Sequence, residues 1–256
     1  MNFEYTSENS VTEKPTESPS EKRYLAVSRS LAVLLEEVHA LEVPETTLEN
    51  WRKLGRIMYI LDDVIDSAEP EAQEKIVQFL KDQVQESASS PESIYEKQES
   101  LTKASEILEE ILQNMDEENK AFLQRLVVML LDVTLAIKEK TDTREVVRLT
   151  RLEGQISAKL FIALLPVSFR QDEKYQEMTN LISRIGRIGN TYDTAIDLPG
   201  DFQAKQIKVT PTPLHRAAFI GAALADGMGI LKKGILTPKT LKIFLKAFTE
   251  VTKDKE

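Results

Sequence analysis

The sequence has no cysteine among its 256 residues and only two histidines, His39 and His215. Without cysteine the chain has no disulfide, no thiolate metal site and no cysteine nucleophile. Two histidines argue against a histidine-rich metal centre of the kind that binds zinc. We therefore expect His39 to be a packed or exposed helix residue, and His215 to have no functional part.

Basic residues are outnumbered by acidic ones: the sequence has 33 lysines and arginines against 42 aspartates and glutamates, which gives a formal net charge of -9. Nucleic-acid-binding proteins normally show a basic patch or stripe, so this balance argues against a nucleic-acid partner. It still allows a local basic pocket for a phosphorylated small molecule. No uncharged apolar run is long enough to cross a bilayer, and the first residues lack the features of a signal peptide. We expect a cytoplasmic protein, with peripheral membrane contact and homodimerisation left open.

The full sequence is 41% apolar, and apolar residues recur at helical spacing along most of it. We find no convincing strand, no internal repeat and no glycine-rich phosphate loop. Residues 1–20 are rich in Ser, Thr, Glu and Pro without apolar spacing, which predicts a disordered N-terminal tail. Residues 21–252 are predicted to form one all-α domain, a helical bundle of about ten helices.

Helix boundaries are predicted from capping residues, glycines and prolines. Thr46 or Thr47 is expected to cap the second helix, Pro70 to stop it, and Pro199 with Gly200 to end a later one. The second helix is expected to carry Trp51 and to run into the acidic stretch at 54–67, and the other predicted helices cover residues 21–43, 71–85, 94–115, 121–137, 146–167, 175–198, 216–231 and 238–252.

Residues 54–67, LGRIMYILDDVIDS, place three carboxylates in an otherwise apolar helix. Asp62 and Asp66 lie one turn apart on one face, with Asp63 beside them. Their charges repel one another, desolvation of each is costly without a partner, and the helix dipole disfavours negative charge near this end. A divalent cation would relieve all three effects, and oxygen-only ligands suit Mg²⁺. The alternative is a solvated acidic helix end.

A second acidic pair, Asp193 and Asp197, has the same one-turn spacing, with Asn190 on nearly the same face. Because Pro199 and Gly200 follow, these carboxylates are also expected in the disfavoured last turn of a helix. Two such arrangements in one helical chain predict metal ligands on two helices. The candidate ligands are Asp62, Asp63, Asp66, Asn190, Asp193 and Asp197.

Three arginines, Arg144, Arg148 and Arg151, lie just before and within the helix predicted at 146–167. They fall at i, i+4 and i+7 and so share one helical face. Such a row is suited to binding phosphate. The alternative is a solvated basic face that pairs with Glu145 or Glu153. Two other acids receive no role: Asp132 is expected at the surface, and Asp226 is an isolated acid in an apolar segment.

The two acidic motifs resemble those of the isoprenoid synthase superfamily. LDDVID at 61–66 is similar to its DDxxD motif, and DTAID at 193–197 to the DxxxD motif of the squalene and phytoene synthase branch. LPGDFQAKQI resembles the loop that follows in that branch, and TRLEGQISAKLFIALLP at 150–166 resembles its cavity-lining helix of small residues. The resemblance covers about residues 24–207, and the order and placement of the short motifs give it most of its weight.

The sequence also departs from the better-known members of the superfamily. It lacks the second DDxxD of head-to-tail prenyl diphosphate synthases. Asn190 is one residue out of register with the Asn/Asp–Ser–Glu triad of terpene cyclases, and Asp197 would replace the glutamate. The chain is short for a squalene synthase and has no recognisable reduced-nicotinamide site. The pattern best resembles a small cyclase-like member related to the squalene synthase branch.

The resemblance implies a bundle of the isoprenoid synthase type, with the two acidic helices facing each other across a central cavity. Mg²⁺ held by the candidate ligands would bind a prenyl diphosphate, and Phe161 and Tyr59 are candidates for the apolar lining. The implied catalytic residues are Asp62, Asp66, Asp193 and Asp197. The implied diphosphate-binding residues are Arg148, Arg151, Arg187 and Lys205.

Three functions fit this sequence. The first is a Mg²⁺-dependent class I terpene synthase or cyclase that ionises one prenyl diphosphate. The second is a head-to-head prenyltransferase that joins two such substrates, as in phytoene formation. The third is a non-catalytic helical scaffold or partner protein that keeps a relic of the fold.

Overall fold

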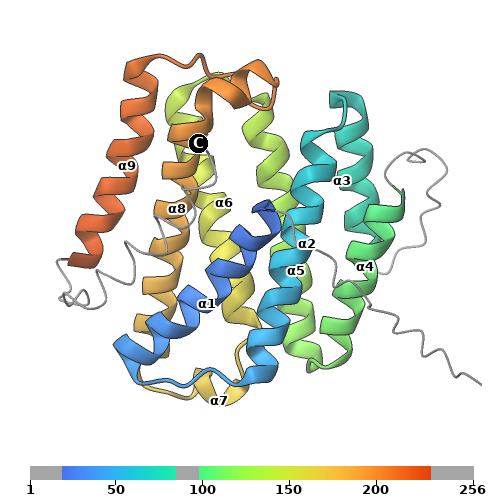
Figure 1. Cartoon of the computed structure of the whole chain (residues 1–256), viewed down its shortest axis with the longest axis vertical. Coiled ribbons are helices and arrows are strands. Elements are labelled where there is room, and N and C mark those ends of the chain that lie inside the picture. Colours follow the sequence, from blue (N-terminus) through green and yellow to red (C-terminus); the bar gives the residue numbers. More distant parts are fainter. Residues whose placement is uncertain (1–18, 85–97, 232–256) are drawn as a thin grey trace, which may run out of the picture.

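The computed structural model describes residues 19–84 and 98–231, and every regular element in these ranges is a helix (Figure 1). The all-α prediction is confirmed for this part of the chain. The helices are α1 (Pro19–His39), α2 (Glu45–Asp66), α3 (Pro70–Val84), α4 (Gln98–Gln113), α5 (Glu117–Glu139), α6 (Thr143–Ala163), α7 (Val167–Arg170), α8 (Tyr175–Gln203) and α9 (Pro213–Leu231). The predicted helix at 238–252, and all but the last two residues of the predicted tail, lie outside the described residues.

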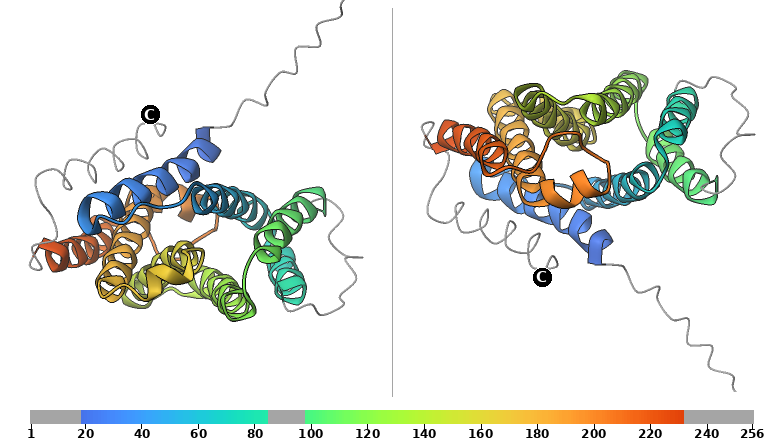
Figure 2. Two further views of the ribbon diagram at one scale, coloured as in Figure 1. Left: turned by 90° about the horizontal axis from the view of Figure 1, so that it is seen from below. Right: turned by 90° about the horizontal axis from the view of Figure 1, so that it is seen from above.

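The long helices run side by side and form two facing groups. Figure 2 shows α1 and α2 on one side and α5 and α6 on the other, with α8 and α9 at one end and α3 and α4 at the other. Helix α6 packs most extensively on α8, which also contacts α1 and α9, and α1 packs on α2. Because α2, α5 and α8 all run upward in Figure 1 while α6 runs downward, the ends of α2, α5 and α8 lie near the start of α6.

The largest apolar cluster joins α1, α2, α4, α5, α6 and α8 around Trp51, whose side chain is completely buried. The indole Nε1 of Trp51 donates a hydrogen bond to the carbonyl oxygen of Phe161, 2.8 Å away. The two rings meet edge to face, with centroids 5.8 Å apart. Burial of a large aromatic side chain with its N–H satisfied is strongly stabilising, so this contact fixes α2 against the C-terminal end of α6.

Two of the helix boundaries that differ from prediction do so for local reasons. Helix α1 ends at His39 rather than at residue 43, because Ala40 adopts a left-handed φ of 54°. The N–H of Ala40 then bonds to the carbonyl of Glu36 at 3.0 Å, as in the αL motif at a helix C-terminus. Helix α2 begins at Glu45 directly after Pro44, which occupies the N-cap position, so neither Thr46 nor Thr47 caps it.

The prediction that Pro199 ends its helix is wrong. Helix α8 continues through Pro199 and Gly200 to Gln203. A proline inside a helix leaves the carbonyl four residues earlier without its N–H partner, here the carbonyl of Ala195. The Nε atom of Arg216, on α9, donates to that oxygen at 3.0 Å. A side chain from another helix thus replaces the missing backbone hydrogen bond.

Because α8 continues to Gln203, the helix dipole acts differently on the two acidic pairs. Asp197 lies six residues before the end of α8, and Asp193 lies a further turn back. The unfavourable effect of the helix dipole falls off within the last turn, so it does not reach these two carboxylates. It does apply to Asp66, which is the last residue of α2 and so lies in the final turn, where the sequence predicted it.

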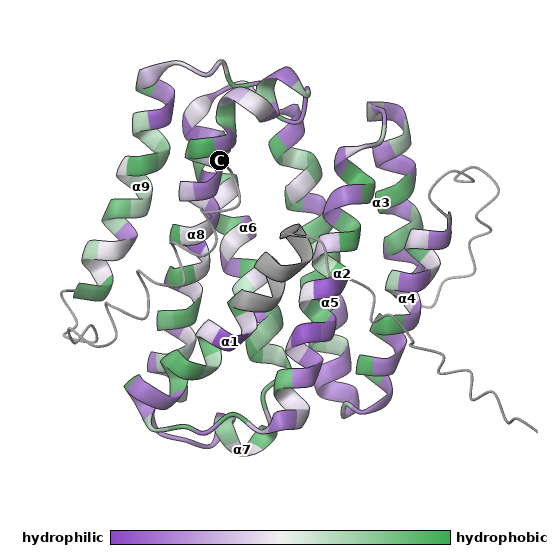
Figure 3. Ribbon diagram, viewed as in Figure 1, coloured by the Kyte–Doolittle hydropathy of each residue, from purple (hydrophilic) through white to green (hydrophobic). Residues whose placement is uncertain are grey.

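Helix α9 is unusually apolar and poorly covered. Among the described residues it alone is long and apolar enough to cross a membrane by length and composition, with a mean hydropathy of 1.2 over a window that is 22% buried. Large side chains such as Leu214 and Leu224 are 77% and 62% exposed, and Figure 3 shows hydrophobic residues along much of the helix. Helices of water-soluble proteins meet the same two criteria, so this finding does not place α9 in a bilayer.

Candidate functional site

A cavity of about 800 Å³ lies between α1, α2, α5, α6 and α8. Its apolar wall includes Leu31 and Leu34 of α1, Met58 of α2, Phe161 of α6 and Ile182 of α8. The residues nearer the chain ends of α2 and α8 are acidic instead. The cavity therefore has an apolar part and an acidic part, and the direction of the helices explains why.

The residues that line the cavity change between apolar and polar along each helix, and the order of the change depends on the direction in which the helix runs. On α2 the lining residues change from Met58 to Asp62 and Asp66 towards the end of the helix. On α8 they change from Ile182 to Asp193 towards its end. On α6, which runs the opposite way, the polar lining residues come first and Phe161 comes last. The polar sections of the three helices therefore lie at the same end of the cavity.

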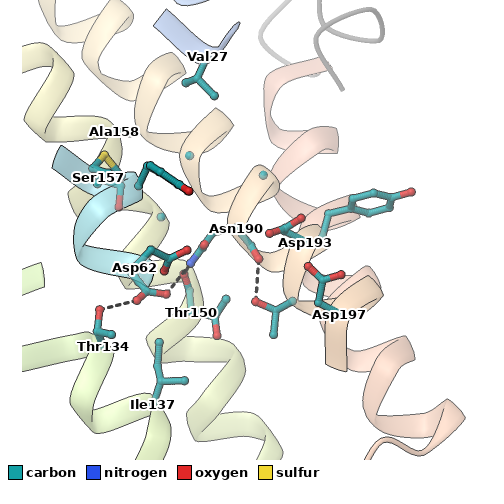
Figure 4. A pocket seen from close by; sticks show the side chains of 18 of the residues that line it. Val27, Asp62, Thr134, Ile137, Thr150, Ser157, Ala158, Asn190, Asp193 and Asp197 are labelled. Carbon is teal, nitrogen blue, oxygen red and sulfur yellow. Dashed lines mark hydrogen bonds between the residues drawn. The ribbon is translucent and has the colours of Figure 1, made fainter. Parts of the chain in front are cut away.

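All six predicted metal ligands line this cavity. Figure 4 draws Asp62 of α2 together with Asn190, Asp193 and Asp197 of α8 around it. Tyr59, Phe161 and Tyr192 line it as well. The predicted ligands are Asp62, Asp63, Asp66, Asn190, Asp193 and Asp197.

The donor chemistry of this set fits Mg²⁺, since every candidate ligand offers oxygen. Within the part of the chain that the structure describes, no group of three acidic or histidine side chains is close enough to hold one metal ion. Mg²⁺ usually binds one or two carboxylates and completes its shell with water and substrate phosphate oxygens. A closed protein cage is therefore not required, and the residues present fit an ion that binds together with a diphosphate.

The predicted diphosphate-binding residues do not line the cavity. Arg148 and Lys205 are exposed on the surface. Arg151 and Arg187 instead bind the buried carboxylate of Asp226, which is 3% exposed. The Nε atoms of Arg151 and Arg187 lie 2.9 Å and 3.0 Å from its two oxygens. The isolated acid of the apolar segment is thus the anchor that joins α9 to α6 and α8.

The basic side chain that does line the cavity was not predicted. Among the described lining residues Lys138, on α5, is the only basic one. Its Nζ atom lies 2.7 Å from the Oδ1 atom of Asp66, and its side chain is 12% exposed. Thr134 and Ile137 line the cavity from the same face of α5. This pattern of polar residues one turn apart in an apolar helix is the signal that could have identified Lys138.

Glu153 also faces the cavity rather than pairing with an arginine on the surface. Its Oε1 atom accepts a hydrogen bond of 2.7 Å from Thr134, and its Oε2 atom accepts one of 2.8 Å from the Nδ2 atom of Asn190. Burial raises the pKa of the Glu153 carboxyl, and the hydrogen bonds from Thr134 and Asn190 oppose that rise. The charge of Asp66 raises the pKa further, while Lys138 lowers it.

Asp132, expected at the surface, is exposed and pairs with Lys81 of α3. It contributes nothing to the cavity lining described above.

The chain has no match among protein-family models, curated proteins or solved structures. The isoprenoid synthase resemblance consequently rests on the residues themselves and stays a prediction.

Proposed function

We propose that this chain is a Mg²⁺-dependent class I terpene synthase of the isoprenoid synthase type, which ionises a prenyl diphosphate. The observation that carries the proposal is the division of one cavity into an acidic end and an apolar remainder. A prenyl diphosphate has the same division, with a highly charged head and a hydrocarbon chain.

The charges at the acidic end favour the binding of a cation. Among the described lining residues there are seven carboxylates and one lysine. A diphosphate alone would be repelled by this set, whereas its complex with divalent cations would be attracted. When bound, Mg²⁺ supplies Lewis-acid stabilisation of the charge on the departing diphosphate. Asp62 and Asp66 on one helix and Asp193 and Asp197 on the other would hold it.

Lys138 replaces the predicted arginines as the proposed protein contact to the diphosphate. Arg151 and Arg187 are already committed to a buried carboxylate, so their release would leave Asp226 buried and uncompensated. Lys138 lies beside the first aspartate motif and is bound to Asp66. A ligand that offered phosphate oxygens, with a metal ion on Asp66, would give its ammonium group a new partner.

The apolar part of the cavity would hold the hydrocarbon chain and exclude water. Leu31, Leu34, Met58 and Phe161 present no hydrogen-bonding side chain there. An allylic cation formed by loss of diphosphate reacts rapidly with water, so a dry wall protects it.

Product analysis tests the proposal. The protein is incubated with geranyl, farnesyl or geranylgeranyl diphosphate, with and without Mg²⁺, and the extract is examined by gas chromatography and mass spectrometry. We expect Mg²⁺-dependent release of diphosphate and a product with the carbon number of one substrate. Asp62→Asn and Asp193→Asn should lose most of this activity. A doubled carbon skeleton would instead identify a head-to-head prenyltransferase, and neither turnover nor binding of diphosphate would identify a non-catalytic helical protein.

A further inference from the structure

Glu153 is the centre of a polar network that joins three helices at the acidic end of the cavity. It lies on α6, accepts one hydrogen bond from Thr134 of α5 and accepts another from Asn190 of α8. Each oxygen of the Glu153 carboxylate has its own donor, so the orientation of the carboxylate is fixed. A buried carboxylate is costly unless such partners are present, and here they come from two different helices.

The amide of Asn190 is oriented by acceptors only. Its Nδ2 atom donates to Glu153 at 2.8 Å and to the backbone carbonyl of Thr150 at 2.9 Å. A backbone carbonyl cannot donate, so the nitrogen must face it, and the two acceptors use both protons of the NH₂ group. The Oδ1 atom of Asn190 has no hydrogen bond from the described residues and is not among the buried unpaired atoms. Since Asn190 lines the cavity, this oxygen is the group left for a ligand.

We propose that Glu153 is a positioning residue, which fixes the amide of Asn190 so that its Oδ1 atom serves as a cation ligand. The inference rests on the proposed function, because it requires a divalent cation at the acidic end. Thr150 alone would leave one N–H of Asn190 without a partner and would not fix the amide. Thr134 in turn fixes Glu153, so the whole arrangement is set by α5, α6 and α8 before any cation binds.

The test measures cation binding rather than turnover. Mn²⁺ affinity is measured by electron paramagnetic resonance in the presence of inorganic diphosphate for the parent, Glu153→Leu, Glu153→Gln and Asn190→Ala. Loss of the residue that orients a metal ligand typically weakens binding by about 10- to 100-fold. We expect this loss in Glu153→Leu and a similar loss in Asn190→Ala. Glu153→Gln should stay near the parent, because its carbonyl oxygen can accept from Asn190 while its amide donates to Thr134.

The double variant Glu153→Leu/Asn190→Ala separates positioning from an independent effect. If Glu153 acts through Asn190, the double variant binds Mn²⁺ no more weakly than Asn190→Ala alone. An additive loss would overturn the inference, and so would an equal loss in Glu153→Gln and Glu153→Leu, because charge rather than position would then be responsible. Parent-level binding in Glu153→Leu would overturn it as well.

A second measurement needs no cation. In ¹⁵N-labelled protein, the side-chain amide protons of Asn190, assigned with Asn190→Ala, should exchange slowly with water in the parent and in Glu153→Gln. They should exchange rapidly in Glu153→Leu. Equal exchange in all three proteins would show that Glu153 does not fix the amide. A parent that binds Mn²⁺–diphosphate and shows this pattern, yet makes no terpene, would overturn the proposed function and leave this inference standing.

Discussion

Gly154 of α6 and Gly186 of α8 touch where the two helices cross. A Cβ atom on Gly186 would lie 2.1 Å from the carbonyl oxygen of Gly154, and one on Gly154 would lie 2.3 Å from the carbonyl oxygen of Gly186. Both obstacles are backbone atoms, which cannot move aside as a side chain can. Glu153 precedes the first glycine and Asn190 lies one turn after the second, so this close contact also brings the proposed positioning pair together.

Gly186→Ala should therefore lower the free energy of unfolding by about 1–3 kcal/mol or more, the usual cost of overpacking a tight contact. The matched control is Gly189→Ala on the same helix, since a Cβ there meets nothing within 4 Å. Alanine is favoured over glycine inside a helix by about 1 kcal/mol, so the control should be neutral or stabilising. Urea denaturation measures both, and equal stabilities for the two variants would contradict the close contact.

The contact between Arg216 and Ala195 makes a prediction through Pro199. Arg216→Met should lower the free energy of unfolding by about 1 kcal/mol, because the carbonyl of Ala195 then has neither a backbone nor a side-chain donor. Pro199→Ala restores the backbone N–H, so Arg216→Met should cost less in that background. A double-mutant cycle by urea denaturation gives the coupling. Equal costs in both backgrounds would show that Arg216 does not compensate for the proline.

Asp226 pairs with Arg151 and Arg187, a group that we call the Asp226 cluster. This pairing predicts different outcomes for Arg151 and Arg148, two arginines of the row predicted from the sequence. Arg151→Ala should destabilise the fold, by about 3–5 kcal/mol if its loss leaves the buried Asp226 carboxylate poorly compensated. The remaining bond from Arg187 would bring the value towards the lower end. Arg148→Ala, one turn away and exposed, should change stability little. Thermal unfolding compares them, and similar melting temperatures would mean that the cluster contributes little to the fold.

His39 predicts a dependence of stability on pH. Burial lowers the pKa of its imidazole, chiefly by desolvation, and its Nε2 atom is buried without a partner among the described residues. The unfolded chain therefore takes up this proton at a higher pH than the folded chain does. The contribution to stability is complete above the unfolded pKa of about 6.5 and is lost as the pH falls towards the folded pKa. His39→Gln should flatten the melting temperature between neutral and mildly acidic pH, and an unchanged slope would contradict this assignment.

The helices could be predicted from the sequence because their apolar spacing is a local property. The acidic end of α2 was predicted for the same reason, since Asp62, Asp66 and the nearby Pro70 lie within a few residues of one another. The continuation of α8 through Pro199 could not be predicted in this way, because the compensating donor, Arg216, comes from the next long helix. The rule that proline ends a helix assumes that no donor from elsewhere in the fold replaces the missing backbone N–H.

In the candidate site, too, local features could be predicted and tertiary contacts could not. Spacing identified five of the six aspartates that line the cavity and missed Asp201, and charge alone could not say which basic residues accompany them. Arg151 and Asp226 are 75 residues apart in sequence and pair only in the folded chain. Lys138 and Asp66 are 72 residues apart and form the pair that does face the cavity. Whether a basic side chain faces the site depends on the acid with which it pairs, and that pairing is set by the tertiary structure.

Lys138 makes the last prediction, because it should affect cations and anions in opposite directions. Its ammonium group neutralises Asp66 at the acidic end of the cavity. Lys138→Met should therefore strengthen the binding of Mg²⁺ alone, since one more carboxylate becomes available and a like charge is removed. The same variant should weaken the binding of Mg²⁺–diphosphate by about 10-fold or more, the loss expected for a charge-assisted contact. Lys138→Arg keeps the charge and is the matched control. Isothermal titration calorimetry measures both ligands, and a loss of affinity for both would mean that Lys138 only supports the fold.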